Sequence, residues 1–138
     1  KKLRANETCT IVNTKRDFLD ISDFLSLMDL VLKEDAPTGA FNVASGNEIT
    51  IPELFDIIVG AMALKADQYK RPIVQSPLME DPNSLLLDPK ATTQMFGWAP
   101  KVSVTMGTQA LINWYDANNV GETYTHLVEH KKNNPHKN

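Results

Sequence analysis

The sequence lacks the features of a secreted, membrane-spanning or nucleic-acid-binding protein. Its single cysteine, Cys9, cannot form an internal disulfide, which favours a reducing compartment. No apolar run approaches the roughly 18 residues that span a bilayer, and no apolar stretch of a signal peptide follows the basic N-terminus. A formal net charge of −3 has the wrong sign for a nucleic-acid surface. We therefore expect a cytoplasmic protein with neither a membrane nor a nucleic-acid partner.

Strands and helices alternate in the predicted elements, as in an α/β protein. The 138 residues are enough for one domain, and 42% hydrophobic residues can form an ordinary core. Predicted strands cover residues 8–13, 18–21, 40–43, 69–74 and 84–87. Predicted helices run from Ser22 or Asp23 to about 33, and over 51–64, 89–96 and 104–117.

Local signals define several helix ends. Thr50 and Glu53 have the spacing of a capping box, in which each side chain accepts from the other's backbone N–H. Asp88 followed by Pro89 is a typical helix start, and Gly97 is a natural left-handed stop. The helix after Asp23 is apolar over most of its circumference, so we expect neighbours on more than one side.

Arg16 lies where an extended segment meets a helix entry, a position suited to holding an anion. The alternative is a surface arginine paired with Asp17 or Asp20. The aspartates Asp17, Asp20 and Asp23 have a spacing that also occurs in metal sites. Helix capping and compensation of the helix dipole explain them better, so no metal site is expected.

Three ordered segments resemble one family. They are Arg16-Asp17-Phe18 with Asp23, residues 41–46 followed by 50–54, and residues 87–90 continuing through 96–100 to Gly107 and 114–115. Together they resemble the extended short-chain dehydrogenase/reductases (SDRs), the NAD-dependent nucleotide-sugar epimerases and dehydratases. The resemblance covers roughly residues 1–117.

The resemblance implies an incomplete extended-SDR fold. It matches the C-terminal, substrate-binding part of the family plus the last helix and strand of the Rossmann sheet, over residues 1–128. Residues 129–138 are expected to be a polar, flexible tail. The family's glycine-rich dinucleotide loop and Tyr-x-x-x-Lys pair do not occur in the sequence. We therefore expect no catalytic residue here, and no NAD bound by this chain alone.

The resemblance also supplies the substrate-binding candidates. Arg16 matches the arginine that contacts the diphosphate of a UDP-, GDP- or dTDP-sugar. Asp81 matches the aspartate of an Arg-x-Gly-Asp segment, but Leu78 stands where that segment has its arginine. Arg71 or Lys70 is the expected substitute for the missing cation.

The remaining polar and aromatic candidates have mainly structural interpretations. Asn42 is expected to bond to the backbone at a strand end rather than to a ligand. His126 and His130 share a helical spacing, but solvated side chains are favoured over metal ligands because no third ligand is near in the sequence. Four further side chains are expected to pack in the interior: Cys9, Trp98, Trp114 and Tyr115.

Three functions remain open. The chain is part of an NAD-dependent epimerase or dehydratase, a stand-alone non-catalytic module that binds a nucleotide-sugar, or a structural oligomer without a ligand. The apolar faces that the absent part of the fold would cover predict a homo-oligomer, or association with an N-terminal half.

Overall fold

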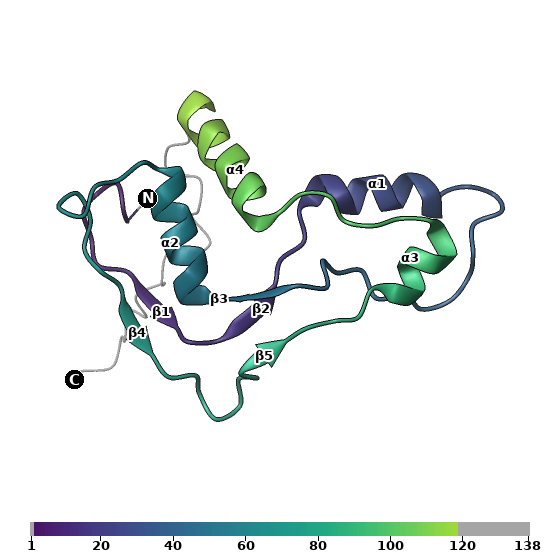
Figure 1. The fold of residues 1–138 in the computed structure, drawn as a ribbon, viewed down its shortest axis with the longest axis horizontal. Coiled ribbons are helices and arrows are strands. Elements are labelled where there is room, and N and C mark those ends of the chain that lie inside the picture. The colour runs from purple at the N-terminus through teal and green to yellow at the C-terminus, as the bar shows by residue number, and fades with distance from the viewer. Residues whose placement is uncertain (1, 119–138) are drawn as a thin grey trace, which may run out of the picture.

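The computed structural model describes residues 2–118, an α/β arrangement of two small sheets and four helices (Figure 1). The α/β class is as predicted. The elements in chain order are β1 (Thr10–Val12), β2 (Lys15–Asp17), α1 (Ile21–Val31), β3 (Glu48–Thr50), α2 (Ile51–Ala61), β4 (Ile73–Gln75), β5 (Ser84–Leu85), α3 (Lys90–Phe96) and α4 (Val104–Asn118).

The two sheets are separate, and β2 is the central strand of the larger one. Strands β1 and β4 form a parallel pair, in which Thr10 lies opposite Ile73. In the other sheet β2 lies between β3, which is antiparallel, and β5, which is parallel. Arg16 therefore sits between Ile49 and Leu85, in the middle of the three-stranded sheet.

The helices lie at two ends of an elongated molecule. Helix α2 packs with β1, β3 and α4 at one end, and α1 lies with α3 at the other, beyond the three-stranded sheet (Figure 1). At the first end the core is formed by Leu3, Phe55 and Val59 with partly buried neighbours, among them Cys9. At the second end Leu27 and Trp98 are buried. Cys9 and Trp98 thus pack in the interior as expected.

The predicted helix ends are confirmed at two places and corrected at a third. Thr50 and Glu53 form both bonds of the capping box, and Gly97 ends α3 with a φ of 61°. Helix α1 is capped by Asp20, not by Ser22 or Asp23. Asp20 Oδ1 accepts from the Ser22 backbone N–H at 2.9 Å, so the cap lies two or three residues earlier than predicted.

Two strand predictions were wrong, because strands depend on partners that lie far away in the sequence. The strand predicted over 18–21 is β2, at Lys15–Asp17, since the pairing residues of β3 and β5 lie opposite that earlier segment. Residues 40–43 form no strand within the described chain, where they find no strand to pair with. Strand β3 was not predicted.

Helix α4 exposes side chains that were expected to pack inward. Leu111 is 52% exposed and Trp114 is 54% exposed, whereas Tyr115 is partly buried. The described neighbour of α4 is α2, so only one side of the helix is covered. No helix within residues 2–118 has the length and apolar character needed to cross a membrane. His126, His130 and the predicted tail lie outside the described residues.

Candidate functional site

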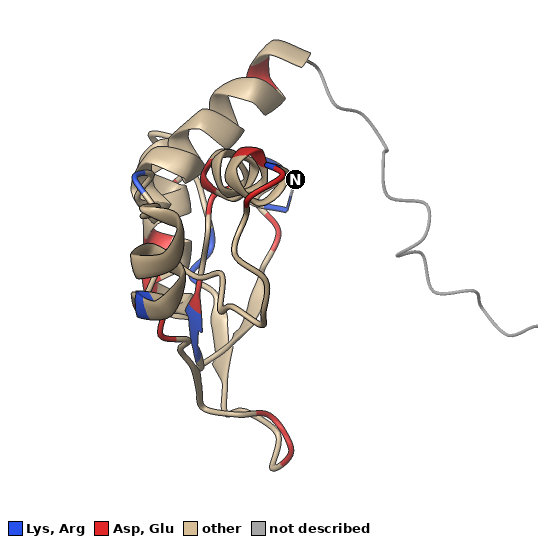
Figure 2. Cartoon of the chain, turned by 90° about the vertical axis from the view of Figure 1, so that its right-hand side faces the viewer, with Lys and Arg blue, Asp and Glu red and all other residues tan. Residues whose placement is uncertain are grey.

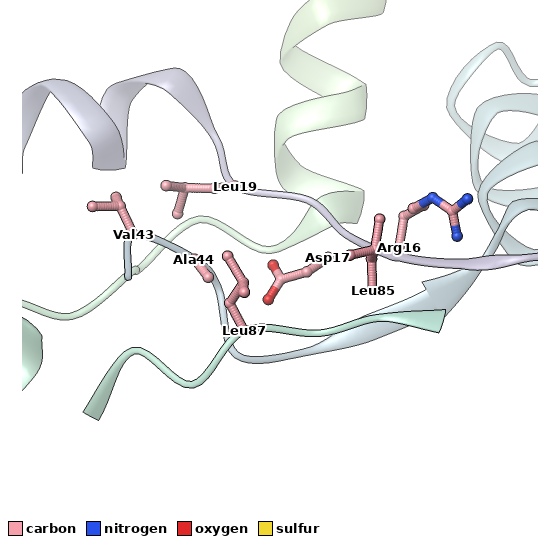
Figure 3. A pocket seen from close by; sticks show the side chains of 7 residues that line it. All are labelled: Arg16, Asp17, Leu19, Val43, Ala44, Leu85 and Leu87. Carbon is pink, nitrogen blue, oxygen red and sulfur yellow. The ribbon is translucent and has the colours of Figure 1, made fainter. Parts of the chain in front are cut away.

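The candidate site is a shallow pocket beside β2. Neighbouring side chains of a strand point to opposite faces, so Arg16 and Asp17 project in different directions, as Figure 3 shows. The pocket has a volume of about 230 Å³, below the roughly 300–1,000 Å³ of small-molecule sites, so it would hold only part of a nucleotide-sugar. It is lined by Arg16, Asp17, Leu19, Val43, Ala44, Leu85 and Leu87.

Among the described residues, Arg16 bonds to neutral backbone oxygens and not to an acidic side chain. Its Nη1 donates to the carbonyl oxygen of Lys15 at 2.7 Å and to that of Pro82 at 3.0 Å. The predicted alternative, a pair with Asp17 or Asp20, is therefore wrong. The other two arginines are ion-paired, Arg4 with Asp116 and Arg71 with Asp56. Within residues 2–118, Arg16 is the arginine without a carboxylate partner.

The nearby lysines are also paired with acids. The Lys15 ammonium lies 3.1 Å from a carboxylate oxygen of Glu48, and the Lys90 ammonium lies 3.6 Å from one of Asp88. The Ser84 hydroxyl and then Lys15 donate to Glu48 and lower the pKa of its carboxyl. The positive charge at Arg16 is therefore less compensated than that of either lysine.

Asp17, on β2, holds the opposite wall of the pocket in place. Its Oδ1 accepts from the Ser45 N–H and its Oδ2 from the Gly46 N–H, both at 2.9 Å. Gly46 has a φ of 73°, and two successive N–H groups in such a turn form a small anion-binding nest. The carboxylate therefore joins β2 to the segment that carries Val43 and Ala44.

The three aspartates of the helix entry serve three different segments. Asp17 holds residues 45–46 and Asp20 caps α1, where the Ser22 hydroxyl and N–H lower the pKa of its carboxyl. Asp23 is buried, and its Oδ2 accepts from the N–H of Lys101 at 3.0 Å and of Val102 at 2.9 Å. No three acidic, histidine or cysteine side chains of residues 2–118 gather as metal ligands would. The predicted helix-capping role is confirmed for Asp20, whereas the side chains of Asp17 and Asp23 accept from backbone N–H groups of other segments.

A second hollow adjoins the first and shares Leu87 with it. Its volume is about 530 Å³. This second hollow is lined in part by Ser45 and Gly46, whose N–H groups donate to Asp17. Both hollows therefore depend on the same turn. Its lining residues are Ser45, Gly46, Leu86, Leu87, Asp88, Pro89 and Lys90.

Leu78 and Asp81 are not among the residues that line the pocket. Both belong to the loop between β4 and β5, which projects from the molecule with acidic residues at its tip (Figure 2). The Asp81 N–H donates to the Leu78 carbonyl at 3.0 Å, and the Leu78 side chain is 75% exposed. The carbonyl of Pro82 brings this loop to Arg16.

Arg71 and Asn42 are engaged elsewhere. Arg71 pairs with Asp56 on α2 at 3.4 Å, and its guanidinium lies 5.8 Å from the centre of the Tyr69 ring. It is not among the residues that line the pocket. Asn42 Nδ2 donates to the Asp88 carbonyl at 3.2 Å, which confirms its predicted role of bonding to the backbone.

Sequence reasoning missed the apolar lining of the pocket. Leu19, Leu85 and Leu87 lie in segments predicted as strands. A short apolar run does not indicate which of its side chains faces a ligand. The sequence could have indicated the role of Ser45 and Gly46, because a glycine after a serine in a turn exposes consecutive N–H groups.

Acidic side chains of this chain cap the N-termini of α1 and α2. At α1 the Ser22 N–H is bonded to Asp20, and at α2 Glu53 bonds to both the N–H and the hydroxyl of Thr50, which lowers the pKa of Glu53. At each of these two helix starts a carboxylate of this chain thus already accepts from a backbone N–H group.

A family model described as GDP-mannose 4,6 dehydratase matches residues 4–111. Escherichia coli dTDP-4-dehydro-6-deoxyglucose reductase is 29% identical over 103 residues, which are 73% of this chain and 31% of that protein. Salmonella muenchen CDP-abequose synthase is 27% identical over 120 residues, 82% of this chain and 39% of that protein. The chain thus spans about a third of the length of these curated relatives.

Solved structures agree with this match. Bordetella bronchiseptica WbmG, in complex with NAD and UDP, is 38% identical with a TM-score of 0.76, and the match covers 84% of this chain and 37% of that one. Thermotoga maritima UDP-glucose 4-epimerase, with UDP-glucose, shares the fold at 21% identity and a TM-score of 0.74, over 86% of this chain and 38% of that one. The chain belongs to the GDP-mannose 4,6 dehydratase family of NAD-dependent nucleotide-sugar epimerases and dehydratases.

Proposed function

We propose that this chain is the C-terminal, substrate-binding portion of an NAD-dependent nucleotide-sugar epimerase or dehydratase, in which Arg16 binds the diphosphate. The main observation behind this proposal is that Arg16 has no carboxylate partner within residues 2–118, whereas Arg4 and Arg71 each have one. A guanidinium on the strand that lines the pocket, bonded within the described residues only to carbonyl oxygens, keeps donors and charge for phosphate oxygens.

The surroundings of Arg16 support a bound ligand of mixed character. The lining beyond it is mainly apolar, from Leu19, Leu85 and Leu87, and suits the less polar part of a ligand whose diphosphate lies at Arg16. WbmG, which is similar to this chain, was crystallised with UDP and NAD. NAD would bind to a part of the enzyme outside the described residues, because the family's glycine-rich dinucleotide loop does not occur in this sequence.

Titration calorimetry with UDP-, GDP- and dTDP-sugars tests the proposal on the purified protein. Arg16→Gln is expected to weaken binding by about 10- to 100-fold, since charge-assisted bonds to phosphate are lost. Arg4→Gln is the matched control, because it removes the same charge from an ion-paired arginine. Unchanged binding in Arg16→Gln, or loss of binding in Arg71→Gln instead, would contradict the assignment.

A second candidate is a non-catalytic module of the same family that binds or associates but does not react. The exposed apolar side of α1 favours it, since this side is available to a separate subunit. The intact mass of the purified protein separates the two candidates. A polypeptide that also carries the glycine-rich loop and the Tyr-x-x-x-Lys pair supports the enzyme, and a mass of 15.4 kDa supports the module.

A further inference from the structure

Helix α4 contains a glycine that its backbone conformation does not require. Gly107 lies near the start of the helix, and the described glycines with a positive φ are Gly39, Gly46 and Gly97. A glycine inside a helix is less favourable than an alanine, because it has more freedom to lose on folding. The reason for a glycine at this position is therefore space and not backbone conformation.

The space beside Gly107 is filled by the carboxylate of Asp20. A Cβ added to Gly107 would lie 2.6 Å from Asp20 Oδ2, well inside the distance at which two such atoms touch. Gly60, in the interior of α2, has no atom within 4 Å of the same position. Gly107 thus lets the start of α4 approach the chain that leads from β2 into α1, and Figure 1 shows the two side by side.

The carboxylate of Asp20 cannot turn away from an added methyl group without loss. Its Oδ1 accepts from the Ser22 N–H at 2.9 Å and from the Ser22 hydroxyl at 2.6 Å. The two oxygens of a carboxylate move together, so a displacement of Oδ2 also moves Oδ1. A methyl group on α4 would therefore strain or break the cap of α1.

Helix α4 is held in place as well. The N–H groups of residues 101–102, just before the helix, donate to Asp23 Oδ2 on α1. Further along, the Gln109 side chain donates to the Ala61 carbonyl of α2 at 3.3 Å, and the two helices pack together. A methyl group on the glycine is therefore expected to displace the chain at Asp20 rather than α4.

A wall of the pocket lies directly beside this contact. Leu19 precedes Asp20 in the chain and lines the pocket together with Arg16. We propose that Gly107 is a positioning residue for this pocket. By leaving room for the Asp20 carboxylate, it keeps the side chain of Leu19 in place for the ligand. The identity of that ligand, a nucleotide-sugar, rests on the proposed function, whereas the contact itself needs no ligand.

Titration calorimetry of Gly107→Ala with UDP-glucose, GDP-mannose and dTDP-glucose tests the proposal. Affinity for the nucleotide-sugar that the unaltered protein binds should fall by about 10-fold, because a displaced Leu19 loses apolar contact with the ligand. Gly60→Ala is the matched control and leaves binding unchanged, since it adds the same methyl group where no atom is near. Unchanged binding in Gly107→Ala, or equal weakening in both variants, would overturn the proposal.

A second substitution separates this contact from general damage to α4. Asp20→Ser keeps a good helix cap but removes the carboxylate oxygen that faces Gly107. In the Asp20→Ser background, Gly107→Ala should change the affinity by at most about two-fold, even where Gly107→Ala alone does not fold. A double variant that does not fold, or that loses the binding retained by Asp20→Ser, would show that α4 itself is damaged and that the proposal is wrong.

The methyl groups of Leu19 report the same contact without a ligand. Their NMR chemical shifts are expected to move in Gly107→Ala and to stay unchanged in Gly60→Ala. If the unaltered protein binds no nucleotide-sugar, the proposed function fails, and the Leu19 shifts still decide this inference. If Arg16→Gln abolishes binding while Gly107→Ala changes neither the affinity nor the Leu19 shifts, this inference alone fails.

Discussion

Two aspartates near the site hold backbone N–H groups in different ways. Asp17 uses both carboxylate oxygens, one for the Ser45 N–H and one for the Gly46 N–H. Asp23 uses the single oxygen Oδ2 for both the Lys101 and the Val102 N–H. An asparagine keeps one acceptor oxygen and replaces the other with an NH₂ donor. The same isosteric change therefore affects the two sites unequally.

We expect Asp17→Asn to cost more stability than Asp23→Asn. At position 17 the new NH₂ group faces a backbone N–H, so one hydrogen bond is lost and two donors oppose each other. At position 23 the amide oxygen can keep both bonds. The free energy of unfolding should fall by about 2–3 kcal/mol for Asp17→Asn and by about 1 kcal/mol for Asp23→Asn. Urea unfolding measures both, and a larger loss in Asp23→Asn would contradict the geometry.

At the scale of elements, helix α2 ends with an unusual residue in its terminal turn. The Ala63 N–H donates to the Gly60 carbonyl at 3.0 Å and the Leu64 N–H to the Val59 carbonyl at 3.3 Å, which is the Schellman pattern. Ala63 takes the left-handed position with a φ of 52°. An L-residue with a Cβ pays roughly 1–2 kcal/mol for this conformation, and glycine does not.

We expect Ala63→Gly to stabilise the protein. The relief of left-handed strain exceeds the added freedom of glycine in the unfolded chain, so the free energy of unfolding should rise by about 0.5–1 kcal/mol. Ala61→Gly, in the helix itself, is the control and should lower it by about 1 kcal/mol. The urea midpoint of each variant measures the change. A fall in both variants would show that Ala63 is not strained.

Elements set by adjacent residues could be predicted from the sequence, and elements set by distant partners could not. Thr50 and Glu53 are three residues apart, and Gly97 acts through its own φ, so both signals sufficed. Residues 40–43 have strand composition, but a strand also needs a neighbour. Trp114 faces outward because another helix covers only one side of α4. The spacing of apolar residues in α4 does not reveal which side that is.

The same limit applies to the candidate site. The local pattern predicted that Arg16 lies in an extended segment shortly before a helix. Tertiary contacts decide the partners of the two arginines. Arg71 pairs with Asp56, whereas Arg16 bonds to the carbonyl of Pro82, 66 residues away. The sequence thus indicated the residue type for an anion site, and the fold distinguished Arg16 from Arg71.

At the scale of the whole molecule, the two ends have unequal cores. At one end Leu3, Phe55 and Val59 pack with six further apolar side chains, which come from α2, β1 and the segments beside them. At the other end the buried apolar residues are Leu27, Trp98 and Ala44, and one apolar side of α1 is exposed. Because local stability follows buried apolar contact, the end with α1 and α3 should open at a lower free energy than the end with α2.

Native-state hydrogen exchange resolves this difference. Amides of α1 and α3 should exchange faster than those of α2 and β1. Trp98→Phe removes the indole N–H that donates to the Asp23 carbonyl and the Ser26 hydroxyl, so it should speed exchange in α1 and α3 alone. Val59→Ala leaves a cavity in the larger core and should speed exchange in α2 and β1 by about 10-fold or more. A uniform increase along the chain in both variants would show that the two ends unfold as one unit.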